Sequence, residues 1–227
     1  AGQTPDNARW LLLETVPNGP DRYSWWNRKE RTLTPLLSTR PELASRTLAR
    51  RLPVTIASRD GLSLPSYLTL PTGARLGADG MPVTPAPLVL LVHGGPWLRD
   101  DLAFDPQHAW LADRGYAVLS VNFRGSGGFG SDFMAKGDRK WSETMHNDLL
   151  DAVQWAIDKG VTAKDSVAVM GLSYGGYSTL VSLSFTPDRF QCGVDLAGPS
   201  NLTRLIGSMP DWWTWQRPQF VNRVGDP

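Results

Sequence analysis

The heptapeptide Gly171–Tyr177, with the sequence Gly-Leu-Ser-Tyr-Gly-Gly-Tyr, constrains the fold of this chain more than any other segment. It follows the apolar run Val167–Met170 and leads into a helix-like stretch, Gly175–Phe185. A serine in a G-x-S-x-G pattern between a strand and a helix is typical of a sharp turn that exposes its hydroxyl. The turn crowds the positions two before and two after the serine, so small residues are required there. We therefore predict that Ser173 is a nucleophile. A chance match is the alternative, but the strand, the helix and the additional glycine argue against it.

Strands and helices alternate after residue 50. The first two expected strands are joined at Asp60-Gly61, a hairpin signal. The later expected strands, beginning with the solid apolar run Leu88–Val92, are short and read as strands buried on both faces. This alternation predicts an α/β fold in which helices cover both faces of a mostly parallel sheet. The expected strands are Val54–Ser58, Leu64–Leu70, Leu88–Val92, Ala117–Phe123, Val167–Met170 and Cys192–Leu196, and the expected helices are Pro106–Arg114, Ser142–Lys159 and Gly175–Phe185.

Residues 1–48 have a different pattern, with short strands separated by turns. Trp10–Val16 and Tyr23–Trp26 read as strands, and Leu33–Leu37 is interrupted by Pro35. Two or three strands this short cannot hide an apolar face by themselves. We therefore divide the chain into a partial β segment, residues 1–48, and an α/β domain, residues 49–227.

A glycine turn, His93-Gly94-Gly95-Pro96-Trp97, follows the expected strand Leu88–Val92. Acyl transfer creates an oxyanion that needs two N–H donors. One donor is expected from Tyr174, the residue after the nucleophile, and the other from a glycine turn after an earlier strand. His93 has a rival interpretation as the catalytic base. We favour a structural role, because the base follows the nucleophile in the sequence of this fold.

The glycine-rich segment Asn122–Gly130 lacks the Gly-Lys-Ser/Thr ending of a phosphate-binding loop and the spacing of a dinucleotide fingerprint. We interpret it as the loop that leaves a buried strand. Arg124 is expected to pair with Asp148, and contact with substrate is the alternative. His108 and His146 are expected to have structural or packing roles.

Four motifs in this order resemble the catalytic domain of the prolyl oligopeptidase family of serine peptidases, and most closely its acylaminoacyl-peptidase and dipeptidyl-peptidase-like branch. The resemblance covers about residues 50–227, and the closing Arg223–Pro227 is also similar. The matching segments are HGGPW (His93–Trp97), NFRGSGGFG (Asn122–Gly130), MHNDLLDAV (Met145–Val153) and GLSYGGY (Gly171–Tyr177).

The resemblance implies an α/β-hydrolase fold, preceded by a β-propeller whose last blade residues 1–48 would form. It also implies cleavage of short peptides, with Ser173 as nucleophile and the N–H groups of Tyr174 and Gly95 as the oxyanion hole. The family order is Ser, Asp, His, but no histidine follows Ser173 here. We expect the α/β domain to be incomplete at its C-terminus, with the triad Asp and His beyond Pro227, and this chain alone to hydrolyse peptides negligibly. A degenerate, inactive homologue is the alternative.

Tryptophans cluster after the strand Cys192–Leu196, at Trp212, Trp213 and Trp215. One interpretation is a hydrophobic cap over the sheet. The other is a wall of the pocket for the substrate side chain beside the scissile bond, because loops at the carboxyl ends of strands often line pockets. Trp97 is similarly placed. Both interpretations remain open.

Composition limits the remaining functions. A net charge of +1 suggests neither a nucleic-acid nor a membrane partner, and the apolar runs are too short to span a bilayer. A single cysteine, Cys192, excludes a thiol metal cluster and an intrachain disulfide. We expect no cofactor, no metal, and a soluble protein of the cytoplasm or periplasm. Oligomers are compatible with the sequence.

A carboxylesterase and a non-catalytic hydrolase-fold scaffold that binds a partner are the alternative functions.

Overall fold

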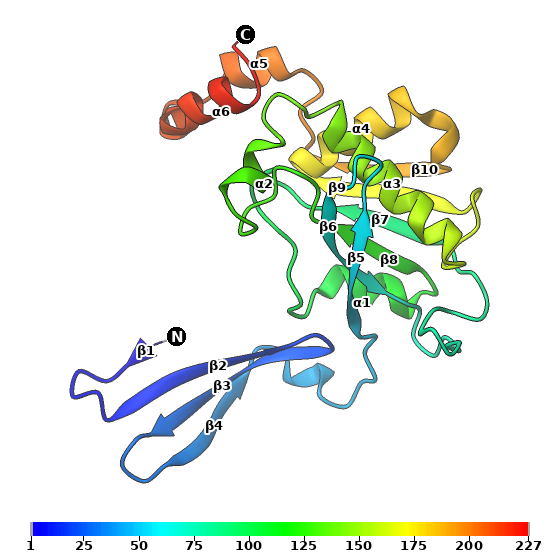
Figure 1. Cartoon of the computed structure of the whole chain (residues 1–227). Helices are drawn as coiled ribbons and strands as arrows, with labels where there is room; N and C mark the ends of the chain where they lie inside the picture. Colours follow the sequence, from blue (N-terminus) through cyan, green and yellow to red (C-terminus); the bar gives the residue numbers. More distant parts are fainter. Residues whose placement is uncertain (1, 227) are drawn as a thin grey trace.

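The computed structural model describes residues 2–226 and contains two separate β-sheets (Figure 1). The first is an antiparallel sheet with strand order β1-β2-β3-β4, drawn in blue at one end of the molecule. Its elements are β1 (Gly2–Gln3), β2 (Arg9–Val16), β3 (Gly19–Asn27) and β4 (Thr32–Ser38), followed by the 3-10 helix η1 (Pro41–Leu43).

The first sheet exposes apolar side chains on both faces. Leu12 and Leu13 are neighbours on β2 and therefore point to opposite faces, yet they are 39% and 43% exposed. Pro35 lies in β4 next to a register irregularity in the pairing with β3, a position where a missing N–H is tolerated. The expectation that these strands cannot hide their apolar faces alone is confirmed. The boundary between residues 48 and 49 falls in the connection between η1 and the next strand, and it remains a prediction.

The second sheet has the strand order β10-β9-β7-β8-β6-β5. Strands β5 and β6, the first two in the chain, form an antiparallel hairpin. β6 also pairs antiparallel with β8, and the other pairs are parallel. The expected elements are confirmed, with ends that shift by at most three residues. The strands are β5 (Arg51–Ala57), β6 (Ser63–Thr69), β7 (Leu88–Val92), β8 (Ala117–Val121), β9 (Val167–Leu172) and β10 (Cys192–Leu196), and the helices up to β10 are α1 (Pro106–Asp113), α2 (Ser131–Ala135), α3 (Thr144–Asp158), α4 (Tyr174–Phe185) and the 3-10 helix η2 (Pro187–Arg189).

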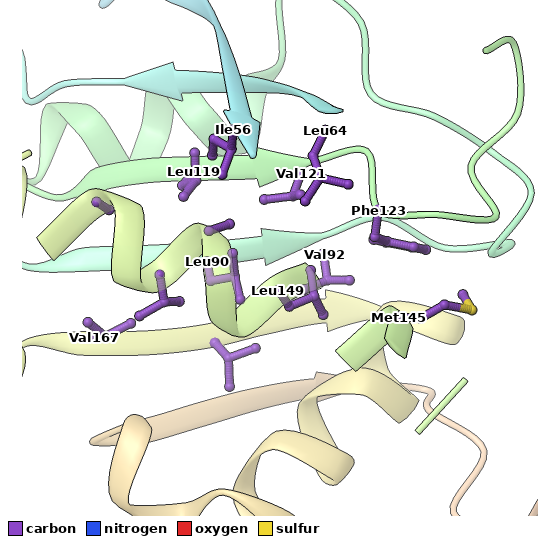
Figure 2. Packing of buried hydrophobic residues seen from close by; sticks show 14 of the residues in the cluster. Ile56, Leu64, Leu90, Val92, Leu119, Val121, Phe123, Met145, Leu149 and Val167 are labelled. Atoms are coloured by element: carbon purple, nitrogen blue, oxygen red, sulfur yellow. The ribbon is translucent and has the colours of Figure 1, made fainter. Parts of the chain in front are cut away.

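The side chains of β7 alternate between two cores. Leu90 and Val92 belong to the larger core, where Met145 and Leu149 of α3 pack against the sheet (Figure 2). Leu91 points to the other face, into a smaller cluster with α1. Because both faces of this strand are covered, its apolar run is continuous rather than alternating. Met145, Leu149 and Val153 recur every four residues on α3 and are buried, so they form the apolar stripe by which that helix covers the larger core.

The prediction that Cys192–Leu196 is a buried strand is wrong. The strand forms as β10, but Val194 is 49% exposed and Leu196 is 38% exposed. Within the described residues, β10 pairs only with β9 and lies at the edge of the sheet. An apolar run indicates strand formation, whereas burial also depends on what packs against the strand.

The chain after β10 forms α5 (Leu202–Gly207), the 3-10 helix η3 (Asp211–Gln216) and α6 (Arg217–Arg223). Figure 1 shows this helical segment, in orange and red, near the end of the domain where α2 also lies. Across residues 2–226, no helix is both long enough and apolar enough to cross a membrane.

Candidate active site

Ser173 stands on the sharp turn that the sequence predicts. It follows β9 directly, precedes the first residue of α4, and has φ 58° and ψ −114°. Its backbone N–H donates a hydrogen bond of 2.8 Å to the carbonyl oxygen of Leu196 at the end of β10. A positive φ in a residue other than glycine is strained, and such strain clusters at functional sites. The turn therefore holds Ser173 where α4 begins, next to the positive end of the helix dipole.

The two glycines that flank Ser173 are required by close contacts, as predicted. A β-carbon on Gly171 would overlap the backbone of Gly175. A β-carbon on Gly175 would in turn overlap the carbonyl oxygen of Val92, the last residue of β7. Helix α4 can therefore approach both β9 and β7 only because these two positions lack side chains.

The turn after β7 places a second glycine backbone beside Ser173. Gly95 has φ 114°, and a β-carbon there would lie 2.6 Å from the backbone nitrogens of Trp97 and Leu98. A β-carbon on Gly94 would lie 3.6 Å from Cβ of Ser173. Among residues 2–226, the N–H groups of Gly95 and Tyr174 donate no hydrogen bond. Both residues line the same cavity as Ser173, and an oxyanion hole requires two backbone donors of this kind.

Both ring nitrogens of His93 have hydrogen-bond partners other than the hydroxyl of Ser173. Its Nδ1 lies 2.8 Å from the carbonyl oxygen of Gly94, and its Nε2 lies 2.9 Å from Oγ of Ser126. The ring stacks on Phe123 with centroids 4.5 Å apart. Burial lowers the pKa of His93 to about 4. This geometry favours the structural interpretation of His93 over that of a base.

A cavity of about 430 Å³ opens beside Ser173. Four aromatic side chains contribute to its wall, and the turn that follows β10 supplies small residues. A largely apolar pocket of this kind suits a ligand with an apolar side chain. The lining residues are Gly95, Trp141, Ser173, Tyr174, Ala197, Gly198, Pro199, Leu205, Trp213 and Phe220.

The sequence left a pocket role open for four tryptophans, of which Trp215 is 73% exposed and does not line the cavity. Trp213 lines the cavity and packs edge-on against Phe220, with ring centroids 5.3 Å apart. Trp212 is 77% exposed and stacks on Trp213, with centroids 6.3 Å apart, without lining the cavity. Trp97 is half-buried and does not line the cavity. Its ring packs edge-on against Phe220, with ring centroids 5.0 Å apart.

Trp141 and Phe220 also line the pocket, although the sequence did not predict this. Trp141 lies between α2 and α3, is 5% exposed, and packs edge-on against Tyr174 with centroids 4.7 Å apart. Phe220 belongs to α6 and is 3% exposed. Neither follows a strand or glycine motif, so local sequence carries no signal for them beyond their aromatic character.

The predicted pairing of Arg124 with Asp148 is confirmed. The guanidinium donates to both carboxylate oxygens of Asp148, at 2.9 and 2.7 Å, and also to Asp60. The other two histidines have structural contacts. His108 is buried between Thr69 and Ser120, and His146 contacts Oγ1 of Thr186.

No group of three or more His, Cys, Asp or Glu side chains within residues 2–226 is arranged to hold a metal ion. A larger cavity, about 530 Å³, lies between residues 40–48 and α1, and its lining contains neither Ser173 nor a glycine turn. The cavity beside Ser173 is therefore the candidate active site.

Sequence comparison identifies relatives along the whole chain. The sequence profile of the prolyl oligopeptidase family matches residues 102–224, slightly more than half of the chain. Dipeptidyl aminopeptidase BIII of Pseudoxanthomonas mexicana is 52% identical over 99% of this chain and 33% of its own length. Dipeptidyl peptidase family member 6 of Caenorhabditis elegans is 43% identical over 97% of this chain and 32% of its own length. The chain thus spans about a third of these relatives.

Structural comparison supports the same fold. The uncomplexed acylaminoacyl peptidase of Pyrococcus horikoshii superposes with a TM-score of 0.79 at 22% identity. The match covers 96% of this chain and 33% of that protein. The two proteins share their fold over nearly the whole length of this chain, including the α/β-hydrolase sheet that carries Ser173.

Proposed function

This chain belongs to the prolyl oligopeptidase family, and on that premise we propose that it carries the nucleophile, oxyanion hole and side-chain pocket of a serine peptidase that acts on short peptides. The observation that carries the proposal is the arrangement around the 430 Å³ cavity. Ser173 lies on a strained turn at its edge, with the free N–H groups of Gly95 and Tyr174 beside it.

The proposed reaction proceeds through an acyl-enzyme. Oγ of Ser173 attacks the scissile carbonyl carbon as a base accepts its proton, and the carbonyl oxygen becomes an oxyanion bound by the N–H groups of Gly95 and Tyr174. The C–N bond then breaks, and the leaving amine takes up the proton. Water hydrolyses the resulting ester and regenerates the serine hydroxyl. The side chain preceding the scissile bond lies in the aromatic cavity.

The base and its orienting carboxylate are proposed to lie beyond Pro227, in the family order Ser, Asp, His. The similar peptidases are about three times as long as this chain, which supports a longer parent protein. Within that parent, residues 1–48 are proposed to form the last blade of a β-propeller, because blades are four-stranded antiparallel sheets. The chain of residues 1–227 alone is expected to hydrolyse peptides negligibly, since losing a triad member costs several orders of magnitude in rate.

The test uses the full-length protein that contains this sequence. A fluorophosphonate probe should label Ser173 alone, and Ser173→Ala should abolish both labelling and hydrolysis. Turnover of peptide p-nitroanilides distinguishes a peptidase from a carboxylesterase, which would hydrolyse only p-nitrophenyl esters. A full-length protein that is neither labelled nor active on either substrate would support the non-catalytic scaffold and overturn the proposal.

A further inference from the structure

The backbone around Gly95 forms no regular secondary structure that would fix it. The chain leaves β7 after Val92, and no helix or strand begins before α1 at Pro106. A backbone N–H stabilises a developing oxyanion only if it is held where the charge forms. Rigid attachment of this turn to its surroundings is therefore a requirement of the proposed chemistry.

One attachment consists of two hydrogen bonds between the side chain of Asn122 and the backbone of Asp100. Oδ1 of Asn122 accepts from the N–H of Asp100 at 2.8 Å, and its Nδ2 donates to the carbonyl oxygen of Asp100 at 3.2 Å. A side-chain amide can both accept and donate in this way, as a neighbouring strand would. Asn122 is 0% exposed, so its amide is shielded from competing water.

Two more attachments come from the same loop. The N–H of Gly127 donates to the carbonyl oxygen of Leu98 at 2.9 Å, and Oγ of Ser126 contacts Nε2 of His93 at 2.9 Å. A β-carbon on Gly127 would overlap the carbonyl oxygen of Trp97. Loop 122–130 therefore contacts the turn on both sides of Gly95.

The loop is itself anchored to the core. The backbone N–H of Arg124 donates to Asp148 at 2.9 Å, in addition to the contacts from its guanidinium. Asp148 is 0% exposed on α3. The N–H of Gly125 donates to the carbonyl oxygen of Phe133 at 3.0 Å. The loop is therefore fixed to the core and can hold the turn in position.

We infer that Asn122 is a positioning residue that holds the N–H of Gly95 in place by fixing the backbone of Asp100. The inference rests on the proposed role of Gly95 as an oxyanion donor. Asn122 is buried and does not line the cavity, so it acts through the turn rather than by contact with substrate.

The experiment compares Asn122→Ala and Asn122→Ser with Thr162→Val in the full-length protein. Thr162 is 2% exposed and its hydroxyl donates to the carbonyl oxygen of Ser166, just before β9 and at the opposite end of that strand from Ser173. The control therefore also loses a buried hydrogen bond. Fluorophosphonate labelling counts active sites, so kcat is expressed per labelled serine. Affinity for a peptide boronic acid reports binding of a tetrahedral adduct that resembles the transition state. Affinity for a product peptide reports binding in the ground state.

Displacing an oxyanion donor should lower kcat per labelled site by about 10- to 100-fold in both Asn122 variants. KM and product affinity should change by less than about threefold, while boronic-acid affinity falls in parallel with kcat. Thr162→Val should leave kcat per labelled site unchanged. The inference is overturned if the Asn122 variants merely lower the labelled fraction. An unlabelled, inactive wild-type protein would instead overturn the proposed function, and this inference with it.

Discussion

The carbonyl oxygen of Val92 occupies the place where a β-carbon at position 175 would lie. This contact joins the end of β7, which leads into the glycine turn, to the first turn of α4, which follows Ser173. The two backbone segments that flank the proposed oxyanion hole are therefore packed directly against each other. Their spacing depends on a missing side chain rather than on a hydrogen bond.

Gly175→Ala should therefore disrupt both the turn and the fold. The methyl group would push α4 away from β7, and we expect the free energy of unfolding to fall by about 2–4 kcal/mol. Labelling of Ser173 by a fluorophosphonate should fall with it. Gly207→Ala is the control, because a β-carbon at Gly207 meets no atom within 4 Å. Equal stability of the two variants would contradict the close contact.

The strain at Ser173 predicts an inverted preference between glycine and alanine. With φ 58° and ψ −114°, Ser173→Gly should be more stable than Ser173→Ala by about 1 kcal/mol. Ser184, on the exposed side of α4, should show the opposite order, because alanine favours helices by about 1 kcal/mol over glycine. Thermal unfolding of the four variants measures both differences. The same order at both positions would show that the turn at Ser173 is unstrained.

The sharp turn at Ser173 was predictable because its rules are local. Glycine spacing, a preceding apolar strand and a following helix lie within one short segment, and each requirement acts on a neighbouring residue. The same holds for β7, whose ends match the prediction because a run buried on both faces has no polar positions to blur it. The Arg124–Asp148 pair was predictable for a different reason, because a buried charge needs a partner of opposite charge and the covering helix supplies a carboxylate.

The pocket was only partly predictable because its wall is assembled from distant segments. Trp141 precedes α3 and Phe220 belongs to α6, and they meet Trp213 only after the helices following β10 have packed. Nor does any motif mark Asn122 as a clamp on Asp100. The exposure of β10 could not be inferred either, because it depends on which elements lie beside the strand.

Burial of His93 predicts a loss of stability in acid. Its pKa in the folded protein is about 4, below its ordinary value of 6.5, so the unfolded chain binds the proton more readily between these values. The stabilising effect of neutral His93 is thus fully present above pH 6.5 and is lost as the pH falls towards 4. The melting temperature should decline over this window, and less steeply in His93→Gln. Part of the decline should persist, because burial also lowers the pKa of His108 and His146. Parallel curves for the two proteins would show that His93 titrates normally.

Trp213 and Trp212 provide a matched test of the pocket, because they are adjacent and only Trp213 lines it. Trp213→Ala should enlarge the cavity and raise kcat/KM for a bulky aromatic residue before the scissile bond, relative to alanine there, by about 10-fold. Trp212→Ala removes an indole that is 77% exposed and should leave that ratio unchanged. Peptide p-nitroanilides differing only in this residue measure the ratio in the full-length protein. If both variants shift the ratio equally, the tryptophans act as a surface cap, and the substrate side chain binds elsewhere.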